Sequence, residues 1–458
     1  MSMHMLPKSS PITTPGLFTP LLREMVDSHD PLIALADAID WSFIEGQLAD
    51  AYASKGSPAK PIRLMVGLLL LKQIENLSDE NVVVQWKRNP YYQYFCGMEE
   101  YTPALPCDST SLVKFRQRIG TEGMEAIFAQ SVALHGKAAQ ESVVIVDTTV
   151  QEKNITYPTD GKLAIKMINH LNKIAKEHRI QQRRTYVKEV KAHRMALRYF
   201  RHPKKIKKAK ASMNRLRTLV GILMRELERK LPSEVLAHYQ ETFARYERVR
   251  NQQPKDKNKI YSLHEPHVYA VAKGKDHKKY EYGTKASIVI THNSGIVVGV
   301  AAHEENEHDS KTLDAALGSA KKHGSSSIIK AVCDRGYRGV KEVDGVSICI
   351  PGTPKKSDSR YQKEKKRQLF RNRAAVEPNI GHMKADHRLV RNHLKGFIGD
   401  EINLLLSASA YNMKKWMNRF LAFLFMLKIL AAARILEQTK STQREKYADV
   451  YLLFYRLW

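Results

Sequence analysis

Cysteine is scarce in this chain of 458 residues, which limits the kinds of site and stabilisation open to it. No C-x2-C pair is present, which argues against a zinc knuckle. Four cysteines are also too few for a disulfide framework in a chain of this size. We therefore expect a protein of the reducing cytosol. The four residues are Cys96, Cys107, Cys333 and Cys349.

Long apolar runs are missing as well. The N-terminal residues Met-Ser-Met-His-Met-Leu-Pro-Lys contain no apolar core of a signal peptide. The most apolar stretch, Phe420 to Leu436, is interrupted by Lys428 and Arg434. Each such charge costs about 2.5–3.5 kcal/mol at the centre of a membrane. We expect a buried or oligomer-facing helix there, and no membrane anchor.

Acidic residues are outnumbered by basic ones. The chain has 47 Asp and Glu against 75 Lys and Arg, a net charge of +28 and a pI near 9.8. Its 43% apolar content is enough to build cores, and its length suits about three domains. A field of this size attracts polyanions, so nucleic acid is the first candidate partner and an anionic membrane surface the second. Merely basic proteins of the ribosomal type are usually much shorter.

Most of the excess charge lies between residues 161 and 260. This segment holds 28 Lys and Arg against 8 Asp and Glu, a net charge of +20, and its pattern is helical with almost no strand signal. A single charge run is usually a solvated face, but a whole helical segment this one-sided favours contact with DNA. The densest part, residues 201–210, contains Lys204, Lys205, Lys207 and Lys208.

The N-terminal part is predicted to be helical after a loose arm over residues 1–28. Residues 29–136 should form a helical DNA-binding domain, with a buried helix over 61–74 and a second helix capped at Ser78. A third helix, capped by Asp108, carries Lys114, Arg116 and Arg118. That helix either enters a major groove or presents a solvated basic face of a plain bundle.

Strand signals begin at Ser142 and resume after Tyr282. The predicted order is a strand, a hairpin, a helix, two strands and a basic helix, which is the order of an RNase H-type α/β core. We therefore predict a mixed five-stranded sheet with helices over 137–160 and 261–415, interrupted by a basic all-helical insert over 161–260. Helices should follow over 416–458. The five predicted strands are 142–147, 285–290, 296–301, 328–334 and 346–350.

Three acids stand out within this plan. Asp147 and Asp334 end predicted strands, and sites in open α/β sheets form beyond such ends. Glu377 lies in Phe370-x2-Arg373-x3-Glu377-x6-Lys384, where helical spacing places Arg373 and Lys384 on the same face. Each acid alone has a plain explanation as a turn residue or a surface ion pair. Together they predict a site for two Mg²⁺ ions, which suits phosphodiester chemistry.

Two other acids compete for these roles. Asp160 is expected in a loop, because it follows Tyr157-Pro158 and precedes Gly161. Asp309 is expected to cap the helix that starts near Ser310.

In this order the segments resemble the DDE transposases of bacterial insertion sequences, of the insertion-sequence-five kind within the insertion-sequence-four-like superfamily. The resemblance covers roughly residues 30–415. Its carriers are Asp147-Thr-Thr-Val with Asn154-Ile-Thr-Tyr-Pro-Thr-Asp160, Lys278-Lys-Tyr-Glu-Tyr-Gly283-x-Lys285, Asn306-x-His308-Asp309, Asp334-Arg-Gly-Tyr337, and a match to the signature Tyr-x2-Arg-x3-Glu-x6-Lys.

The resemblance implies that Asp147, Asp334 and Glu377 form a catalytic triad for two Mg²⁺ ions, with Mn²⁺ as an alternative. It also implies that Arg373 and Lys384 contact DNA phosphate. One position departs from the signature: Phe370 replaces its tyrosine, so the chain has no hydroxyl there to bond the DNA backbone, while ring stacking remains.

The resemblance also implies the reaction and the partners. The expected enzyme binds the terminal inverted repeats of its element, cleaves at the ends and joins the 3′ ends to target DNA. A second copy of the chain would pair the two ends, and the expected location is the bacterial cytoplasm, on the nucleoid when DNA is bound. Two alternatives stay open: a nuclease that cuts without joining, and a DNA-binding protein without catalysis.

Overall fold

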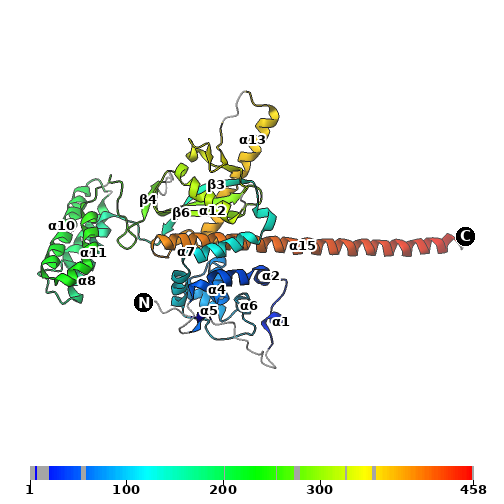
Figure 1. Ribbon diagram of the computed structural model, residues 1–458, viewed down its shortest axis with the longest axis horizontal. Coiled ribbons are helices and arrows are strands. Elements are labelled where there is room, and N and C mark those ends of the chain that lie inside the picture. Colours follow the sequence, from blue (N-terminus) through cyan, green and yellow to red (C-terminus); the bar gives the residue numbers. More distant parts are fainter. Residues whose placement is uncertain are drawn as a thin grey trace.

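A computed structural model of the chain describes residues 20–52, 58–200, 202–253, 255–272, 279–324, 327–352 and 357–455. It also describes the backbone of the short strand β1 (Leu6–Pro7), which pairs in parallel with β2 (Pro58–Ala59). For residues 433–455 the backbone alone is described. Figure 1 shows N-terminal helices, a sheet with its own helices, and a separate helical body, with one very long helix running between the first two.

The N-terminal region is helical, as predicted from its caps. Ser78 accepts a hydrogen bond from the Asn81 amide, and Asp108 accepts one from the Thr110 amide, so both satisfy the first turns they precede. Its helices are α1 (Leu22–Met25), α2 (Pro31–Ala38), α3 (Trp41–Leu48), α4 (Ile62–Ile74), α5 (Asp79–Trp86), α6 (Pro90–Phe95) and α7 (Ser109–Ala133).

The predicted loose arm differs from the structure in its last part. Helix α1 forms there, Leu22 is fully buried, and Leu21 makes an isolated bridge to Glu100. Burial of these apolar side chains holds the segment on the helical region. Residues 1–5 and 8–19 lie outside the described part of the chain.

The sheet is mixed and has eight strands, three more than the sequence predicts. The strand order is β4-β5-β3-β7-β9-β8, with β6 also paired to β5 and β10 to β3. Strand β3 is the centre: it runs antiparallel to β5 and parallel to β7. The strands are β3 (Val143–Lys153), β4 (Tyr269–Ala272), β5 (Tyr280–Thr291), β6 (Val297–His303), β7 (Lys330–Val332), β8 (Glu342–Val343), β9 (Val346–Cys349) and β10 (Arg391–Asn392).

Between β3 and β4 lies a helical body with its own core, which we call the helical module. Its buried residues, such as Leu171, Leu223 and Phe243, form a cluster separate from the core of the rest of the molecule. An amphipathic α10 places leucines inward and lysines outward. The module comprises α8 (Asp160–Glu177), α9 (Val187–Ala196), α10 (Ile206–Lys230) and α11 (Ser233–Asn251).

Helix α15 (Gly396–Tyr455) joins the N-terminal helices to the sheet. It contacts α2, α4 and α7 as well as β6, and one continuous apolar core extends from Leu32 to Met417. The predicted boundary at residue 415 therefore falls inside a single helix. The sequence predicts a buried or an oligomer-facing helix over residues 420–436; the structure contradicts burial within the chain, because Phe423, Phe425 and Leu430 are more than half exposed, and the oligomer-facing alternative stays a prediction.

The basic helix that carries Glu377 is not continuous, in contrast to the prediction. Helix α13 (Arg360–Arg373) ends before α14 (Val376–Asp386) begins. Pro378 explains the break, because its ring nitrogen carries no hydrogen to donate to the carbonyl of Ala374. The amides of Ala374 and Ala375 instead donate three residues back, to Arg371 and Asn372. Arg373 and Glu377 therefore lie on different helices.

Among the described helices, none is both long enough and apolar enough to span a membrane.

Candidate active site

Asp147 and Asp334 lie side by side because of the register of two parallel strands. Ile145 of β3 pairs with Val332 of β7, and each aspartate lies two residues further along its own chain. Paired residues of parallel strands face the same side, so this spacing brings both carboxylates to one face of the sheet. Both side chains are partly exposed, so a ligand can approach them from solvent.

Local hydrogen bonds fix each aspartate. Asp147 accepts from the Thr148 amide at 2.8 Å, and Asp334 accepts from the Gly336 amide at 2.8 Å. The negative field around them is felt by a buried neighbour: burial, followed by the charges of Asp334 and then Asp147, raises the pKa of the Cys333 thiol. The thiol is therefore neutral at physiological pH and serves as packing.

A further carboxylate, Asp309, lies at this site, where the sequence marks it as a competitor but predicts a helix cap instead. Its Oδ1 atom lies 2.9 Å from the Lys285 ammonium and accepts from the Thr148 hydroxyl at 3.2 Å. It does not cap a helix; the His308 side chain accepts the Ser310 amide instead. A Cβ atom built on Gly336 would lie 2.9 Å from Asp334 Oδ1 and 3.1 Å from Asp309 Oδ2, so the two carboxylates flank this glycine.

Tyr337 lies beneath the carboxylates. Its side chain is fully buried. Burial is the main cause that raises its pKa, with added contributions from Cys333 and from the charges of Asp147 and Asp309. Tyr337 therefore stays protonated next to the acids.

Glu377 enters from a different element. It is exposed in the first turn of α14, behind the fully buried Val376, and α14 contacts β3. Within the described residues, no group of three His, Cys, Asp or Glu side chains has the spacing of a metal site. The two aspartates offer the all-oxygen donors that Mg²⁺ prefers. The three acids therefore lie on neighbouring elements, but their carboxylates are not spaced as the ligands of one metal site.

The cations predicted to hold DNA phosphate near the triad are both half-buried. Arg373 ends α13 and is close enough to Cys333 for its charge to lower the pKa of that thiol, against the larger effect of burial. Lys384 lies in the last turn of α14.

The basic residues of α7 have three different environments. Arg116 is 3% exposed and donates to both carboxylate oxygens of Asp79, so its predicted role in DNA contact is wrong for this structure. The guanidinium of Arg118 lies 5.0 Å from the centre of the Tyr52 ring. Lys114 is exposed and remains a candidate for DNA contact.

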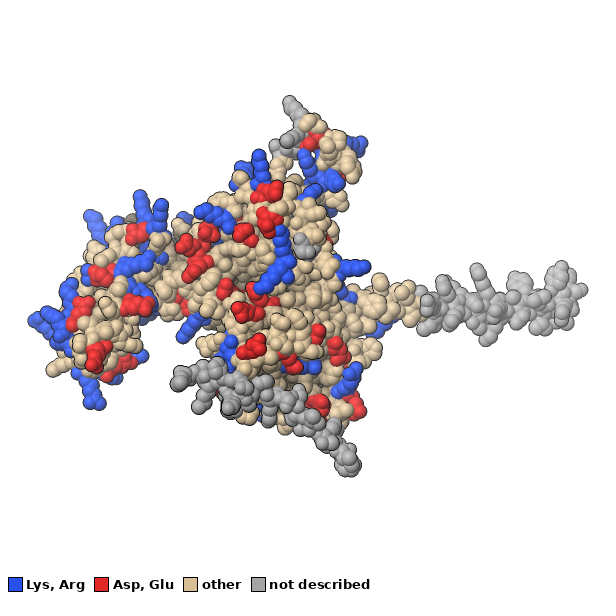
Figure 2. Space-filling model, viewed as in Figure 1, with Lys and Arg blue, Asp and Glu red and all other residues tan. Residues whose placement is uncertain are grey.

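The lysines of the helical module face solvent. Lys204, Lys205, Lys207 and Lys208 are all exposed, and Figure 2 shows basic side chains spread over this body. The ammonium group of Lys205 lies 4.4 Å from the centre of the Tyr199 ring. Lys278, which begins one motif of the resemblance, lies outside the described residues, whereas Lys285 at the end of that motif is buried in the ion pair with Asp309.

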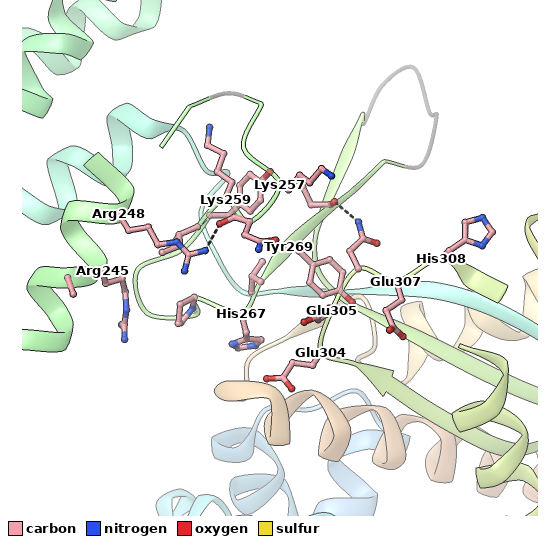
Figure 3. A pocket seen from close by; sticks show the side chains of 18 of the residues that line it. Arg245, Arg248, Lys257, Lys259, His267, Tyr269, Glu304, Glu305, Glu307 and His308 are labelled. Atoms are coloured by element: carbon pink, nitrogen blue, oxygen red, sulfur yellow. Dashed lines mark hydrogen bonds between the residues drawn. The ribbon is translucent and has the colours of Figure 1, made fainter. Parts of the chain in front are cut away.

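A cleft of about 960 Å³ separates the module from the edge of the sheet, and none of the three predicted acids lines it. Figure 3 shows Arg245 and Arg248 on the side of the module and Glu304, Glu305 and Glu307 on the other. Arg248 is held by the carbonyl of Asn258 at 2.7 Å, and Arg245 by the carbonyl of Leu263. The cleft has walls of opposite charge, so it does not suit a polyanion.

Comparisons with known proteins agree with this organisation. Residues 20–118 match a family described as "Transposase domain (DUF772)", and residues 248–413 match "Transposase DDE domain". The second segment contains Asp334 and Glu377, while Asp147 precedes it. The chain is also 39% identical over 191 residues to "Uncharacterized protein ORF8 in nfe locus" of Rhizobium meliloti, an alignment that covers 41% of this chain and 92% of that protein. No solved structure matches significantly.

Proposed function

The chain belongs to the DDE transposase family, and from this premise we propose that it binds the terminal inverted repeats of an insertion sequence, cleaves at the ends and joins the 3′ ends to target DNA. We interpret its sheet as an RNase H-like core and the helical module as an insert in that core. The observation that carries the proposal is the parallel register of β3 and β7, which pairs Ile145 with Val332 and so brings Asp147 level with Asp334 just beyond the end of β7.

Asp147, Asp334 and Glu377 are the residues proposed to hold two divalent cations, Mg²⁺ or Mn²⁺. Bound cations of this kind activate an attacking oxygen and stabilise a leaving one. The role of the protein is to fix the carboxylate oxygen atoms that would bind the cations. The amides of Thr148 and Gly336 each hold one carboxylate oxygen, which sets the orientation of both carboxyl groups. Glu377 would close on the site with α14 when DNA is present.

Lys285 and Asp309 are proposed to position the aspartates. Lys285 is 7% exposed and holds Asp309 Oδ1, and the same oxygen ties the Thr148 hydroxyl next to Asp147. The other oxygen of Asp309 faces Gly336 and hence the loop of Asp334. The ion pair of Lys285 and Asp309 therefore touches both the segment of Asp147 and the loop of Asp334. Residues that hold metal ligands in place in this way strongly affect metal affinity and activity.

Binding of DNA is proposed to involve the helical module, with Lys204, Lys205, Lys207 and Lys208, together with Lys114 of α7. Arg373 and Lys384 would hold a phosphate beside the acids. A homodimer is proposed for the DNA complex, because both ends of an element must be held together for joining. The exposed apolar part of α15 is a candidate for the contact between the two copies.

A strand-transfer assay tests the proposal against its rivals. With pre-cleaved ends, a supercoiled target and Mg²⁺, we expect joined product. Metal-dependent cleavage without joining would support a nuclease. DNA binding without either reaction would support a protein that has lost catalysis. In each of these two cases the proposed function would be withdrawn.

A further inference from the structure

An aromatic pocket lies where the helical module meets the sheet, away from the carboxylates. It has a volume of about 420 Å³, within the usual range for small-ligand pockets. Its walls come from the segment before α8, from the end of α9 and the start of α10, and from β5 with the segment before it. Rings and apolar groups line it, among them Tyr157, Leu197, Phe200, Met213, Tyr261 and Tyr282.

The rings at this pocket form a connected cluster. Tyr282 is at the centre, with the Tyr157 ring 5.5 Å away at 87° and the Tyr261 ring 5.2 Å away at 55°. Tyr157 is 58% exposed and Phe200 is 43% exposed. Two large rings are therefore open to solvent at one hollow, and exposed apolar surface gathered in one place often marks a binding site.

Charge around the pocket identifies the class of ligand. Lys162 and Lys166 are exposed on the first turns of α8, and their ammonium groups reach the Tyr157 carbonyl and the Thr156 hydroxyl at 3.0 and 3.3 Å. Exposed rings with cations nearby suit single-stranded nucleic acid, because phosphates contact the cations and bases stack on the rings.

The floor of the pocket is polar and fixed. Asp160 begins α8 and is not a loop residue. Its carboxylate accepts from Lys259, Arg217 and Gln252, so it is held in place between the module and the segment that returns to the sheet. A pocket of about 420 Å³ can take up a single base but is too small to admit a duplex.

The pocket is within reach of DNA bound at the acids. Asp147 pairs with Ile288 on β5, and Tyr282 lies six residues from Ile288 along the same strand. At about 3.3 Å per residue this separates the pocket from the site by roughly 20 Å. A DNA strand held at the carboxylates would need about six nucleotides to span this distance.

We propose that this pocket binds an unpaired nucleobase of the DNA held by the same chain, stacked on the exposed Tyr157 ring, with Tyr282 meeting the base edge to face. The inference rests on the proposed function only in requiring that the chain binds DNA. It adds a base-stacking contact to a surface that otherwise binds phosphates.

Binding of two single strands tests this directly. The probes are a 20-nucleotide oligo(dT) and an abasic strand of the same length, both measured in EDTA so that no cleavage occurs. The wild-type chain is expected to bind oligo(dT) at least about fivefold more tightly. Tyr157→Ala should reduce that preference by about fivefold or more without changing the salt dependence, and Tyr157→Phe should keep it. Tyr101→Ala, a half-exposed tyrosine of the N-terminal region, is the matched control.

Two outcomes would overturn the proposal. One is equal affinity of the wild type for the two strands, or a preference that Tyr157→Ala leaves unchanged. The other is an equal fall in affinity for both strands in Tyr157→Ala, which would assign this residue to the backbone. Neither outcome bears on cleavage or joining, so failure here is distinct from failure of the proposed function.

Discussion

Lys285 of β5 and Asp309, which begins the short turn of helix before α12 (Leu313–His323), form an ion pair of 2.9 Å at the edge of the two aspartates of the candidate site. The lysine side chain is 9% exposed and the aspartate side chain 29% exposed. The pair stands between Thr148, next to Asp147, and Gly336, next to Asp334. We therefore propose that this ion pair holds the segments of Asp147 and Asp334 in position.

Asp309→Asn should impair cleavage without impairing DNA binding. The amide cannot hold the Lys285 ammonium as a carboxylate does, so the loops of Asp147 and Asp334 would lose their common anchor. We expect cleavage to fall about ten- to a hundredfold, as for other partners of metal ligands. Titration with Mn²⁺, followed by paramagnetic resonance, should show weaker binding. Unchanged Mn²⁺ affinity together with unchanged cleavage would remove Asp309 from the site.

Gly336→Ala should act on the same atoms by crowding. The added Cβ would lie 2.9 Å from Asp334 Oδ1 and 3.1 Å from Asp309 Oδ2, and one of the carboxylates must move. We expect cleavage to fall with little change in melting temperature. Gly318→Ala is the control, because a Cβ there meets no atom within 4 Å. Equal activity of the two variants would show that the carboxylates tolerate displacement.

Arg116→Met should destabilise the chain and leave its affinity for DNA nearly unchanged. Arg116 is buried and makes a bidentate pair with Asp79, so its removal leaves a carboxylate, 15% exposed, with Lys72 alone. Removing one partner of such a pair costs about 3 kcal/mol. Urea unfolding measures this effect. Lys114→Met on the same helix is exposed and should do the reverse, reducing the slope of log affinity against log salt by about 0.9. A larger change in affinity for Arg116→Met than for Lys114→Met would restore the arginine to the DNA surface.

The ion pairs that Asp79 forms with Arg116 and Lys72 also predict that the free energy of unfolding depends on pH. Burial alone would raise the pKa of its carboxyl, but hydrogen bonds and charge from Arg116 and Lys72 outweigh burial and lower it from 3.8 to about 2. A lowered pKa stabilises the fold above pH 3.8, and this contribution, about 2 kcal/mol, is lost as the pH falls through 2. The difference in unfolding free energy between wild type and Arg116→Met should therefore shrink from pH 5 to pH 2. A constant difference over this range would contradict the assignment.

The lysines at the start of α10 should contribute to the electrostatic part of DNA binding. Replacing Lys204, Lys205, Lys207 and Lys208 with Gln should reduce the salt slope by about 0.9 for each phosphate that these lysines neutralise. Lys321 and Lys322, which pair with Asp344 and Glu125, offer control positions away from the module. A slope that changes no more than in the controls would place the DNA elsewhere.

Sequence patterns predicted the two aspartates because each follows a short run of buried apolar residues, Val144 to Val146 in one case and Ala331 to Cys333 in the other. The same patterns stopped β3 too early. Residues such as Gln151 and Lys153 look like surface residues, yet both are buried, with Lys153 bonded to Asp400, to the carbonyl of Leu394 and to that of Gly396 at the start of α15. Only the fold supplies those partners. A polar strand end is therefore indistinguishable from a loop in the sequence alone.

Long-range partners also explain the other differences. Asp309 finds Lys285 from 24 positions away, and Arg116 finds Asp79 from 37 positions away, so neither pairing has a local signal. Pro378 is different, because its position within the basic helix was visible in the sequence. Its lack of an amide hydrogen could have predicted the break between Arg373 and Glu377. The sequence pattern predicts the three acids, but its prediction that Arg373 and Glu377 share one continuous helix is wrong.

Cleavage and joining of end-bearing DNA by Glu377→Gln, compared with wild type at equal DNA occupancy in Mg²⁺ and in EDTA, tests the central claim most directly. If Asp147, Asp334 and Glu377 act as one metal-dependent site, the wild type loses both reactions in EDTA, and the variant loses both by several orders of magnitude in Mg²⁺ while still binding DNA. Wild-type levels of metal-dependent cleavage and joining in Glu377→Gln would contradict the account.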